Sequence, residues 1–510
     1  MLKVESLVAL IQSLNKTEKR QFATSFNKRD LSKDYMVVYN IIERDKKFNQ
    51  EEIRNDFLNK IPNGSFHTAV TYLYEKLLDL LLHSYKKNDS FIALFYKILE
   101  AKILYERSMF RESLELLSNI IVEAEKMENY NALLLAYRME LDFLLRFNYL
   151  NISEQELFHK QYAIINTLKI IGKINEESSL YELLKHRLIY KGNIRSNKQR
   201  KEMNDLLISE LSIVVSSKSD NFEITKMHQL FQAYYLISAG DYNAALQSFK
   251  ELIVLFESNS HLWANPPFYY LSTIEGVLVS LRSIGNYKDM DFFKEKLRNL
   301  KEHFSIDFRV EVICLLYEYE LFPLLDSGNF DDCIILMKKY KEILYDRYLY
   351  LRPLRHTELF LYTSLIYLGN KQFKQAKKYI NDITFDRNLG DVPISRTVRL
   401  IRLVLYYEEG DYEIIPYEIR SFKRKYFKNN KHGFKVERLI LWFVNHGSVP
   451  LFKQKRDKIW THIKPKIDAL CNDKYEMPVL GIFDFTSWVE AKILKKNLSE
   501  ILKKNFIHKV

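Results

Sequence analysis

The sequence predicts an all-α protein built as an α-solenoid, a stack of helical hairpins. Glycine and proline number only 13 and 10 among the 510 residues, against roughly 12% of an average protein, so the chain has little material for β-turns. The 34 tyrosines and 33 phenylalanines supply large apolar side chains for packing helix against helix. A turn motif also recurs along most of the chain. We therefore expect helix in well over half of the residues and essentially no sheet.

The recurring motif is a glycine or asparagine, then an aromatic or large apolar residue, then an amphipathic helix. Its members follow one another at intervals of about 43 residues, which lies within the range of helical solenoids. Two members, at Tyr149 and Ile194, are weak and fill gaps between the others. The remaining members supply the aromatic turn anchors Phe110, Tyr242, Tyr287, Phe330, Phe373 and Tyr412.

Each part of the motif has a physical reason. A glycine can adopt the left-handed conformation that ends a helix, and five turns contain one: Gly192, Gly240, Gly285, Gly328 and Gly410. We expect the aromatic anchor to lie buried between the two helices of its own hairpin. Small residues three positions later would let the helices approach closely, and they are Ser113, Ala245, Cys333 and Ala376.

Turns of this form, such as GDYNAA at 240–245, resemble the central turn of tetratricopeptide repeats. The period exceeds the 34 residues of that family, so the resemblance implies about eight tetratricopeptide-like hairpins rather than a regular array. The segments at 13–22, 72–85 and 483–493 are also similar to an uncharacterised family of bacterial helical-repeat proteins. That second resemblance implies architecture only, because the family brings no known activity.

We expect three parts: an N-terminal helical module at 1–88, the helical-repeat solenoid at 89–435 and a basic C-terminal helical cap at 436–510. The cap should contain a helix pair around Trp460 and Trp488.

The module should contain five helices, the second capped by Asn15 with Glu18 and the last capped by Ser65. The expected helices span 4–14, 16–28, 34–46, 49–59 and 65–86. The last two are ordered like a helix-turn-helix. However, a recognition helix offers polar side chains to DNA, whereas the apolar residues of this helix should leave it mostly buried. Packing against the solenoid is the favoured role.

The known catalytic and cofactor motifs are absent from the sequence. No two glycines are closer than Gly276 and Gly285, which excludes the phosphate-binding loop, the dinucleotide-binding turn and the nucleophile elbow. The three cysteines, Cys314, Cys333 and Cys471, lie too far apart for a zinc site or a disulfide framework. The histidines form no metal-ligand spacing. We expect no enzyme activity, no cofactor, no catalytic residues and no metal.

The N-terminus has the periodicity of an amphipathic helix, with Glu5 and Gln12 interrupting its apolar stretch, and it lacks a signal-peptide cleavage site. No uncharged apolar run approaches the length that spans a bilayer. We expect a cytoplasmic protein with no membrane span.

All of the net positive charge lies near the C-terminus. Residues 420–510 contain 21 lysines and arginines against 8 aspartates and glutamates, in a chain of net charge +12. A basic face on one helix would suit a polyanion, and the helical spacing groups Arg420, Lys423, Arg424 and Lys428 opposite Ile419, Phe422 and Tyr426.

These observations favour a scaffold or adaptor that binds a protein or peptide through a helical-repeat groove, since stacked hairpins form a long surface without reactive groups. One alternative is a nucleic-acid- or ribosome-associated factor that uses the basic C-terminal region. Another is a peptide-sensing regulator whose N-terminal module binds DNA. One sequence selects neither the groove residues nor the oligomeric state.

Overall fold

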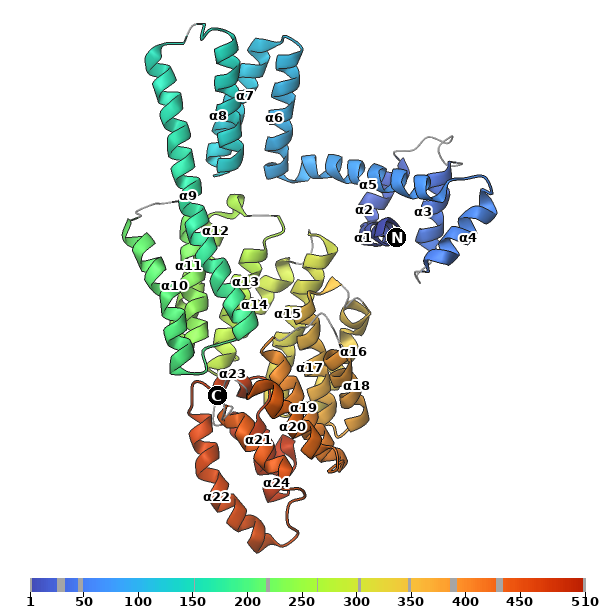
Figure 1. The fold of residues 1–510 in the computed structure, drawn as a ribbon, viewed down its shortest axis with the longest axis vertical. Coiled ribbons are helices and arrows are strands. Elements are labelled where there is room, and N and C mark those ends of the chain that lie inside the picture. Colours follow the sequence, from blue (N-terminus) through green and yellow to red (C-terminus); the bar gives the residue numbers. More distant parts are fainter. Residues whose placement is uncertain are drawn as a thin grey trace. The chain divides into compact units, whose positions relative to one another are not determined.

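Helices make up 82% of the structure, a computed structural model, and its described residues contain no strand (Figure 1). This confirms the predicted all-α fold class. The structure describes the whole chain except residues 1, 25–32, 45–48, 151, 217–220, 264, 301–303, 347–349, 386–391, 428–433 and 508–510. The chain divides into two units, residues 1–171 and residues 172–510.

The first five helices lie close to the ranges expected from their capping residues. They are α1 (Leu2–Ser13), α2 (Lys16–Thr24), α3 (Asp34–Arg44), α4 (Gln50–Lys60) and α5 (Phe66–Asn88). The predicted capping pair is confirmed: Glu18 N donates to Asn15 Oδ1 at 2.9 Å, and Asn15 N donates to Glu18 Oε2 at 2.8 Å. Ser65 behaves differently, because its hydroxyl bonds to the Thr68 hydroxyl at 2.8 Å instead of capping the backbone.

The core of these five helices includes Leu7, Phe22, Val38, Phe57 and Leu73, all of them buried. Helix α5 contributes one apolar stripe to this core. The prediction that α5 is mostly buried is wrong for Leu78 and Leu82, which are exposed. In this part of the helix the apolar side chains of α5 itself point to all sides, whereas the neighbouring helices cover only one side.

Four helices follow: α6 (Ser90–Glu106), α7 (Phe110–Lys126), α8 (Tyr130–Arg146) and α9 (Glu154–Lys191). Helices α6 and α7 form the first hairpin of the motif. Ser113 is fully buried between them, and its hydroxyl donates to the Ala101 carbonyl at 2.7 Å. A small residue at this position therefore lets the two helices approach closely. Helix α9 continues from the first unit into the second.

The second unit contains a row of antiparallel hairpins. Its helices are α10 (Asn197–Ser216), α11 (Phe222–Ala239), α12 (Tyr242–Ser258), α13 (Phe268–Ser283), α14 (Met290–Leu300), α15 (Ile306–Asp326), α16 (Phe330–Lys339), α17 (Pro353–Gly369), α18 (Phe373–Phe385), α19 (Ile394–Glu409) and α20 (Ile415–Tyr426), with the short η2 (Ser260–Leu262) and η3 (Lys341–Tyr345).

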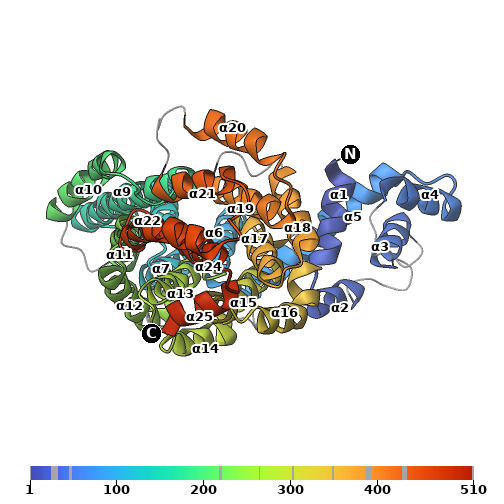
Figure 2. The same ribbon diagram turned by 90° about the horizontal axis from the view of Figure 1, so that it is seen from below.

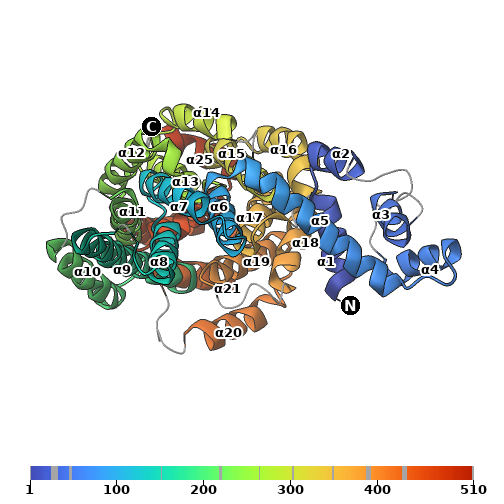
Figure 3. The same ribbon diagram turned by 90° about the horizontal axis from the view of Figure 1, so that it is seen from above.

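These helices form an inner and an outer layer. Figures 2 and 3 show the even-numbered helices from α10 to α20 on the outside and the odd-numbered helices from α11 to α19 on the inside. The burial pattern agrees: α15, α17 and α19 are buried on most sides, whereas α14, α16 and α20 each bury one stripe. The inner helices therefore surround a central region.

The predicted turn conformation is confirmed. Gly192, Gly240, Gly285, Gly328 and Gly410 all have positive φ, between 74° and 79°. Where the motif lacks glycine, another residue takes the same conformation two positions before the anchor: Lys371 has φ 59° and Ser108 has φ 64°. The period read from the sequence is thus a period of left-handed helix ends.

The anchors occupy a different place from the one predicted. Four of them contact the end of the first helix of the next hairpin, instead of lying buried within their own hairpin. The contacts are Phe110 with Phe147 at 4.4 Å between ring centroids, Tyr242 with the Ser283 hydroxyl, Tyr287 Oη with Asp326 Oδ2 at 2.8 Å, and Asn370 Nδ2 with the Phe330 carbonyl at 3.0 Å. Phe330 is buried, whereas Phe110, Tyr242, Tyr287 and Phe373 are half-buried. Phe110, Tyr242, Tyr287 and Phe330 therefore join consecutive hairpins.

Tyr412 contradicts the predicted burial, because 40% of it is exposed. Helix α20 begins three residues after it, with Pro416 in its first turn. Ile415 therefore takes the buried position at the start of the helix, and the Tyr412 ring rests edge-on against Tyr407 at 5.6 Å.

The chain ends with α21 (Lys435–Asn445), α22 (Lys453–Cys471), α23 (Met477–Leu480), α24 (Phe485–Leu494) and α25 (Leu498–Ile507). The segment from α23 to α25 runs back along the turns of earlier hairpins. Its hydrogen bonds are Arg282 Nη2 to Gly481 O at 2.7 Å, Ser499 Oγ to Gly328 O at 2.6 Å, Lys371 Nζ to Asn497 Oδ1 at 3.1 Å, and Trp488 Nε1 to Glu408 Oε1 at 2.7 Å. The C-terminal helices thus tie several hairpins together.

Candidate functional site

Charged side chains lie on the buried faces of the inner helices. Helix α15 contributes Glu311 and Glu318, which are seven residues apart and so share one face of the helix. Both carboxylates are almost completely buried. Helix α13 contributes Glu275, and α17 contributes Arg355 and Glu358. Five charged groups from three helices therefore meet inside the second unit.

Arg355 is at the centre of this cluster. Its Nη2 donates to Glu275 Oε1 at 2.5 Å, and its Nη1 donates to Glu318 Oε2 at 3.0 Å and to Glu358 Oε2 at 3.2 Å. Its Nε lies 3.7 Å from Glu311 Oε2. A single guanidinium, 11% exposed, thus pairs with four carboxylates. We call these five residues the Arg355 cluster.

Arg352 supports the cluster from one side, where its Nε donates to Glu311 Oε1 at 2.9 Å and its Nη2 donates to Glu311 Oε2 at 3.1 Å. The planar guanidinium matches the two oxygens of the carboxylate, which fixes the orientation of Glu311. Glu311 therefore has a second cation of its own.

The protonation of the cluster follows from burial and charge. Burial alone lowers the pKa of Arg355, but Glu275 and Glu318 outweigh it and hold that pKa well above its usual value. Burial opposes the ionisation of Glu275, yet Arg355 more than compensates and its pKa is lowered. For Glu318 and Glu358 burial dominates and raises the pKa of each carboxyl. Burial therefore disfavours the charged form of Glu318 and Glu358, whereas Arg355 and Glu275 stabilise each other's charge.

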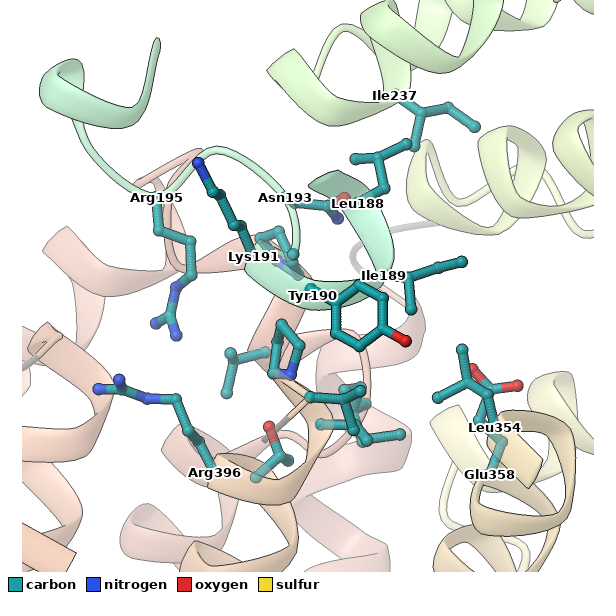
Figure 4. A pocket seen from close by; sticks show the side chains of 18 of the residues that line it. Leu188, Ile189, Tyr190, Lys191, Asn193, Arg195, Ile237, Leu354, Glu358 and Arg396 are labelled. Atoms are coloured by element: carbon teal, nitrogen blue, oxygen red, sulfur yellow. The ribbon is translucent and has the colours of Figure 1, made fainter. Parts of the chain in front are cut away.

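The cluster borders a cavity of about 580 Å³ within the second unit. Glu275 and Glu358 reach it, and much of the remaining lining is apolar: Leu188, Ile189, Ile237, Val279, Leu354 and Ile482. Figure 4 shows Arg195 and Arg396 on one side of Tyr190, and Leu354 and Glu358 on the other. The cavity therefore combines an apolar wall with charged groups at separate places, as ligand sites commonly do.

Lys185 is a cationic side chain of the cavity wall that forms no ion pair with a described carboxylate. Its ammonium lies 3.8 Å from the centroid of the Tyr234 ring, which is a cation–π distance. No acidic group of the described residues forms an ion pair with it. Burial lowers the pKa of Lys185 to about 8. A carboxylate or carbonyl oxygen of a ligand at this position would form an ion pair or a hydrogen bond with the Lys185 ammonium.

The two arginines of the cavity wall are already paired. Arg195 Nη2 lies 2.6 Å from Glu476 Oε2, and Arg396 binds both oxygens of Glu437 at 2.8 Å. Both guanidinium groups lie near the Phe434 ring, at 3.6 Å and 4.8 Å from its centroid. These contacts hold the start of α21 against the wall, so the arginines help to shape the cavity.

The predicted polyanion face lies on α20, an outer helix. Arg420, Lys423 and Arg424 are exposed, and Ile419 and Phe422 on the other side of the helix are buried. Lys428 lies outside the described residues. The Arg420 guanidinium is 4.6 Å from the centroid of the Tyr417 ring. The structure thus places three of the four predicted cations together on one exposed surface.

Sequence reasoning missed the cavity and the Arg355 cluster. One signal was present: α15 and α17 are apolar nearly all round, yet they contain charged residues at helical spacing. Such residues must pair when their helix is buried. Their partners lie on other helices, at distances along the chain that a single sequence does not reveal.

No helix within the bounds given above is both long enough and apolar enough to cross a bilayer. Among the residues with described positions, no group of three or more histidine, cysteine, aspartate or glutamate side chains is arranged to hold a metal ion. No protein-family model matches the chain, and no curated protein is significantly similar to it.

Proposed function

We propose that the chain is a non-enzymatic scaffold or adaptor, built from tetratricopeptide-like hairpins, that binds a segment of a protein or peptide in the cavity beside the Arg355 cluster. The observation that carries this proposal is the cavity itself. Its volume of about 580 Å³ falls in the range that holds a drug-sized ligand, and so suits a few residues of a peptide.

The chemistry of the lining supports the same proposal. Apolar side chains such as Val279 and Ile482 would bury the side chains of a ligand, and Lys185 would bind a carboxylate or a carbonyl oxygen. The two acidic groups of the wall, Glu275 and Glu358, both pair with Arg355. These side chains are therefore suited to binding, orienting and burying a ligand.

Filling the cavity should abolish binding of such a ligand. Peptides selected from a phage-displayed random library on the full chain are the probe, and fluorescence anisotropy measures their affinity. Val279→Trp and Ile482→Trp place an indole in the cavity, and we expect each to weaken binding by at least about tenfold, or about 1.4 kcal/mol.

Val254→Trp is the matched control, because Val254 lies on outer helix α12 and is 63% exposed. It should leave the affinity unchanged. Peptides that bind both cavity variants as tightly as the parent protein would show that the cavity is not the binding site.

The exposed cations on α20 favour a second function, binding of nucleic acid on the outer surface. Each cation that neutralises a phosphate adds about 0.9 to the slope of log affinity against log salt. If the four predicted cations all engage RNA, the slope should be at least about 3. Changing Arg420, Lys423, Arg424 and Lys428 to Glu should flatten it, with the melting temperature within a few degrees of the parent.

The control for this experiment reverses three exposed cations on another outer helix, Lys198, Arg200 and Lys201 of α10. A parent protein that does not bind RNA, or a slope that both sets of changes reduce equally, would remove the α20 face as a specific nucleic-acid site.

A further inference from the structure

The loop between α21 and α22 presents the two most exposed large apolar side chains of the described residues. Leu451 is 79% exposed and Phe452 is 73% exposed. They are adjacent, and Phe452 is the N-cap residue of α22. In Figure 1 this loop lies at the end of α22 that is remote from α23. Adjacent apolar side chains exposed to this degree mark an interaction site more often than isolated ones do.

Hydrogen bonds hold this apolar pair in place. Arg456 Nη1 donates to the Leu451 carbonyl at 2.5 Å and to the Pro450 carbonyl at 3.4 Å. The Arg456 backbone N–H donates to the Phe452 carbonyl at 3.3 Å. The backbone is therefore tied to the first turn of α22 while both side chains point away from the protein core.

Three exposed lysines follow the pair in the first two turns of α22. Lys453, Lys455 and Lys458 are exposed, and none of them forms an ion pair with a described residue. The Lys455 ammonium lies 5.9 Å from the centroid of the Phe452 ring. We call these three lysines together with Leu451 and Phe452 the α22 tip.

The rest of α22 continues this pattern. The helix packs on the protein through Ile463, Ile467 and Leu470. Its exposed surface adds Lys464 and Lys466 to the lysines of the tip. Only two acidic residues, Asp457 and Asp468, lie within the helix. The exposed side of α22 is therefore strongly basic.

We propose that the α22 tip binds the surface of an anionic phospholipid membrane. Leu451 and Phe452 enter the boundary between headgroups and acyl chains, and the lysines contact the headgroup phosphates and carboxylates. Stable attachment to a membrane surface needs two such signals together, apolar insertion and a basic patch, because each alone is weak.

The apolar pair distinguishes a lipid surface from a nucleic acid. A nucleic acid engages cations and aromatic rings, and an aliphatic side chain such as Leu451 would gain nothing from its phosphates. Hydrocarbon, in contrast, removes both Leu451 and Phe452 from water. The combination of an aliphatic side chain, an aromatic ring and unpaired ammonium groups at one tip therefore fits lipid better than RNA.

Co-sedimentation of the full chain with vesicles tests this proposal. We expect binding to phosphatidylcholine vesicles that contain about 30% phosphatidylserine, and much weaker binding to pure phosphatidylcholine. The double change Leu451→Ser with Phe452→Ser should reduce partitioning by about 10- to 100-fold. The triple change of Lys453, Lys455 and Lys458 to Glu should remove the preference for phosphatidylserine. All five side chains are exposed, so both variants should melt like the parent.

The control is the double change Val254→Ser with Ile335→Ser, which removes two apolar side chains with exposures of 63% and 67% from outer helices. It should partition like the parent protein. Equal losses in the control and the tip variant would overturn the proposal, as would a parent protein that does not bind the anionic vesicles. Binding that needs the lysines but not Leu451 and Phe452 would also overturn it, and would assign the tip to polyanions in general.

Insertion itself has a separate readout. Leu451→Cys, labelled with an environment-sensitive fluorophore in a Cys471→Ser background, should shift its emission to the blue on the anionic vesicles and not on RNA. Cys314 and Cys333 are buried and should escape labelling. The same label at Ile335→Cys should show no shift on either. An unshifted label at position 451 on vesicles that bind the protein would exclude apolar insertion.

Discussion

Replacing Arg355 with methionine should lower the free energy of unfolding of residues 172–510 by about 3–5 kcal/mol, because the change leaves buried carboxyls without their shared cation. Glu275, Glu318 and Glu358 all pair with this guanidinium, whereas Glu311 keeps Arg352. The measurement is urea denaturation followed by tryptophan fluorescence. All four tryptophans, at 263, 442, 460 and 488, lie in this unit, so the signal reports on it alone.

The loss of unfolding free energy in the Arg355→Met variant should depend on pH. Without Arg355, the folded-state pKa of Glu275 rises from below to above its unfolded value, and that of Glu358, which is already raised in the parent protein, rises further. A carboxyl with a raised folded pKa lowers the stability of the folded state as the pH rises through that pKa, because the folded chain then holds more protons than the unfolded chain. The variant should therefore fall further behind the parent protein between about pH 5 and about pH 8.

Arg298 provides the control. It pairs with Glu295 and Glu320, but its side chain is 37% exposed. Solvent screens such a pair, so Arg298→Met should cost less than about 1 kcal/mol, with little dependence on pH. Similar losses for the two methionine variants would mean that the Arg355 cluster is an ordinary surface network and does not fix the inner helices.

The sequence predicted what local chemistry determines. Helix ends follow from capping groups such as Asn15 with Glu18, and the turn period follows from residues that adopt positive φ, so both were visible in one chain. The packing of the C-terminal segment on earlier hairpins was not visible in the sequence, because hydrogen bonds such as that between Trp488 and Glu408 join residues far apart along the chain.

The cavity was hidden for a related reason. Lys185, Glu275 and Arg355 belong to three different hairpins, and each alone fits a solvated or core position. Only the curvature of the inner layer brings them together, and curvature depends on small rotations between hairpins that no local pattern encodes. The basic face of α20 was visible because its residues lie within two helical turns.

The second large effect concerns the turn anchors. Phe330→Ala should lower the free energy of unfolding of the same unit by about 3–5 kcal/mol, because it empties a closed site. The ring lies against Gly369, the last residue of α17, so closely that a Cβ added at Gly369 would come within 2.2 Å of it. Phe249 lies in the same way against Gly276, where an added Cβ would meet the ring at 2.3 Å. In both cases an aromatic of an outer helix packs on a glycine of the next inner helix.

Tyr412→Ala is the matched comparison, since Tyr412 occupies the same place in the sequence motif but is 40% exposed. Because protein atoms cover only part of its ring, we expect Tyr412→Ala to lower the free energy of unfolding by about 0.5 kcal/mol. Denaturation followed by tryptophan fluorescence measures both variants. A large loss for Phe330 with a small one for Tyr412 would show that contact with the next hairpin, and not membership in the motif, makes an anchor stabilising. Equal losses would contradict this, because burial against Gly369 would then add nothing to what the shared turn already provides.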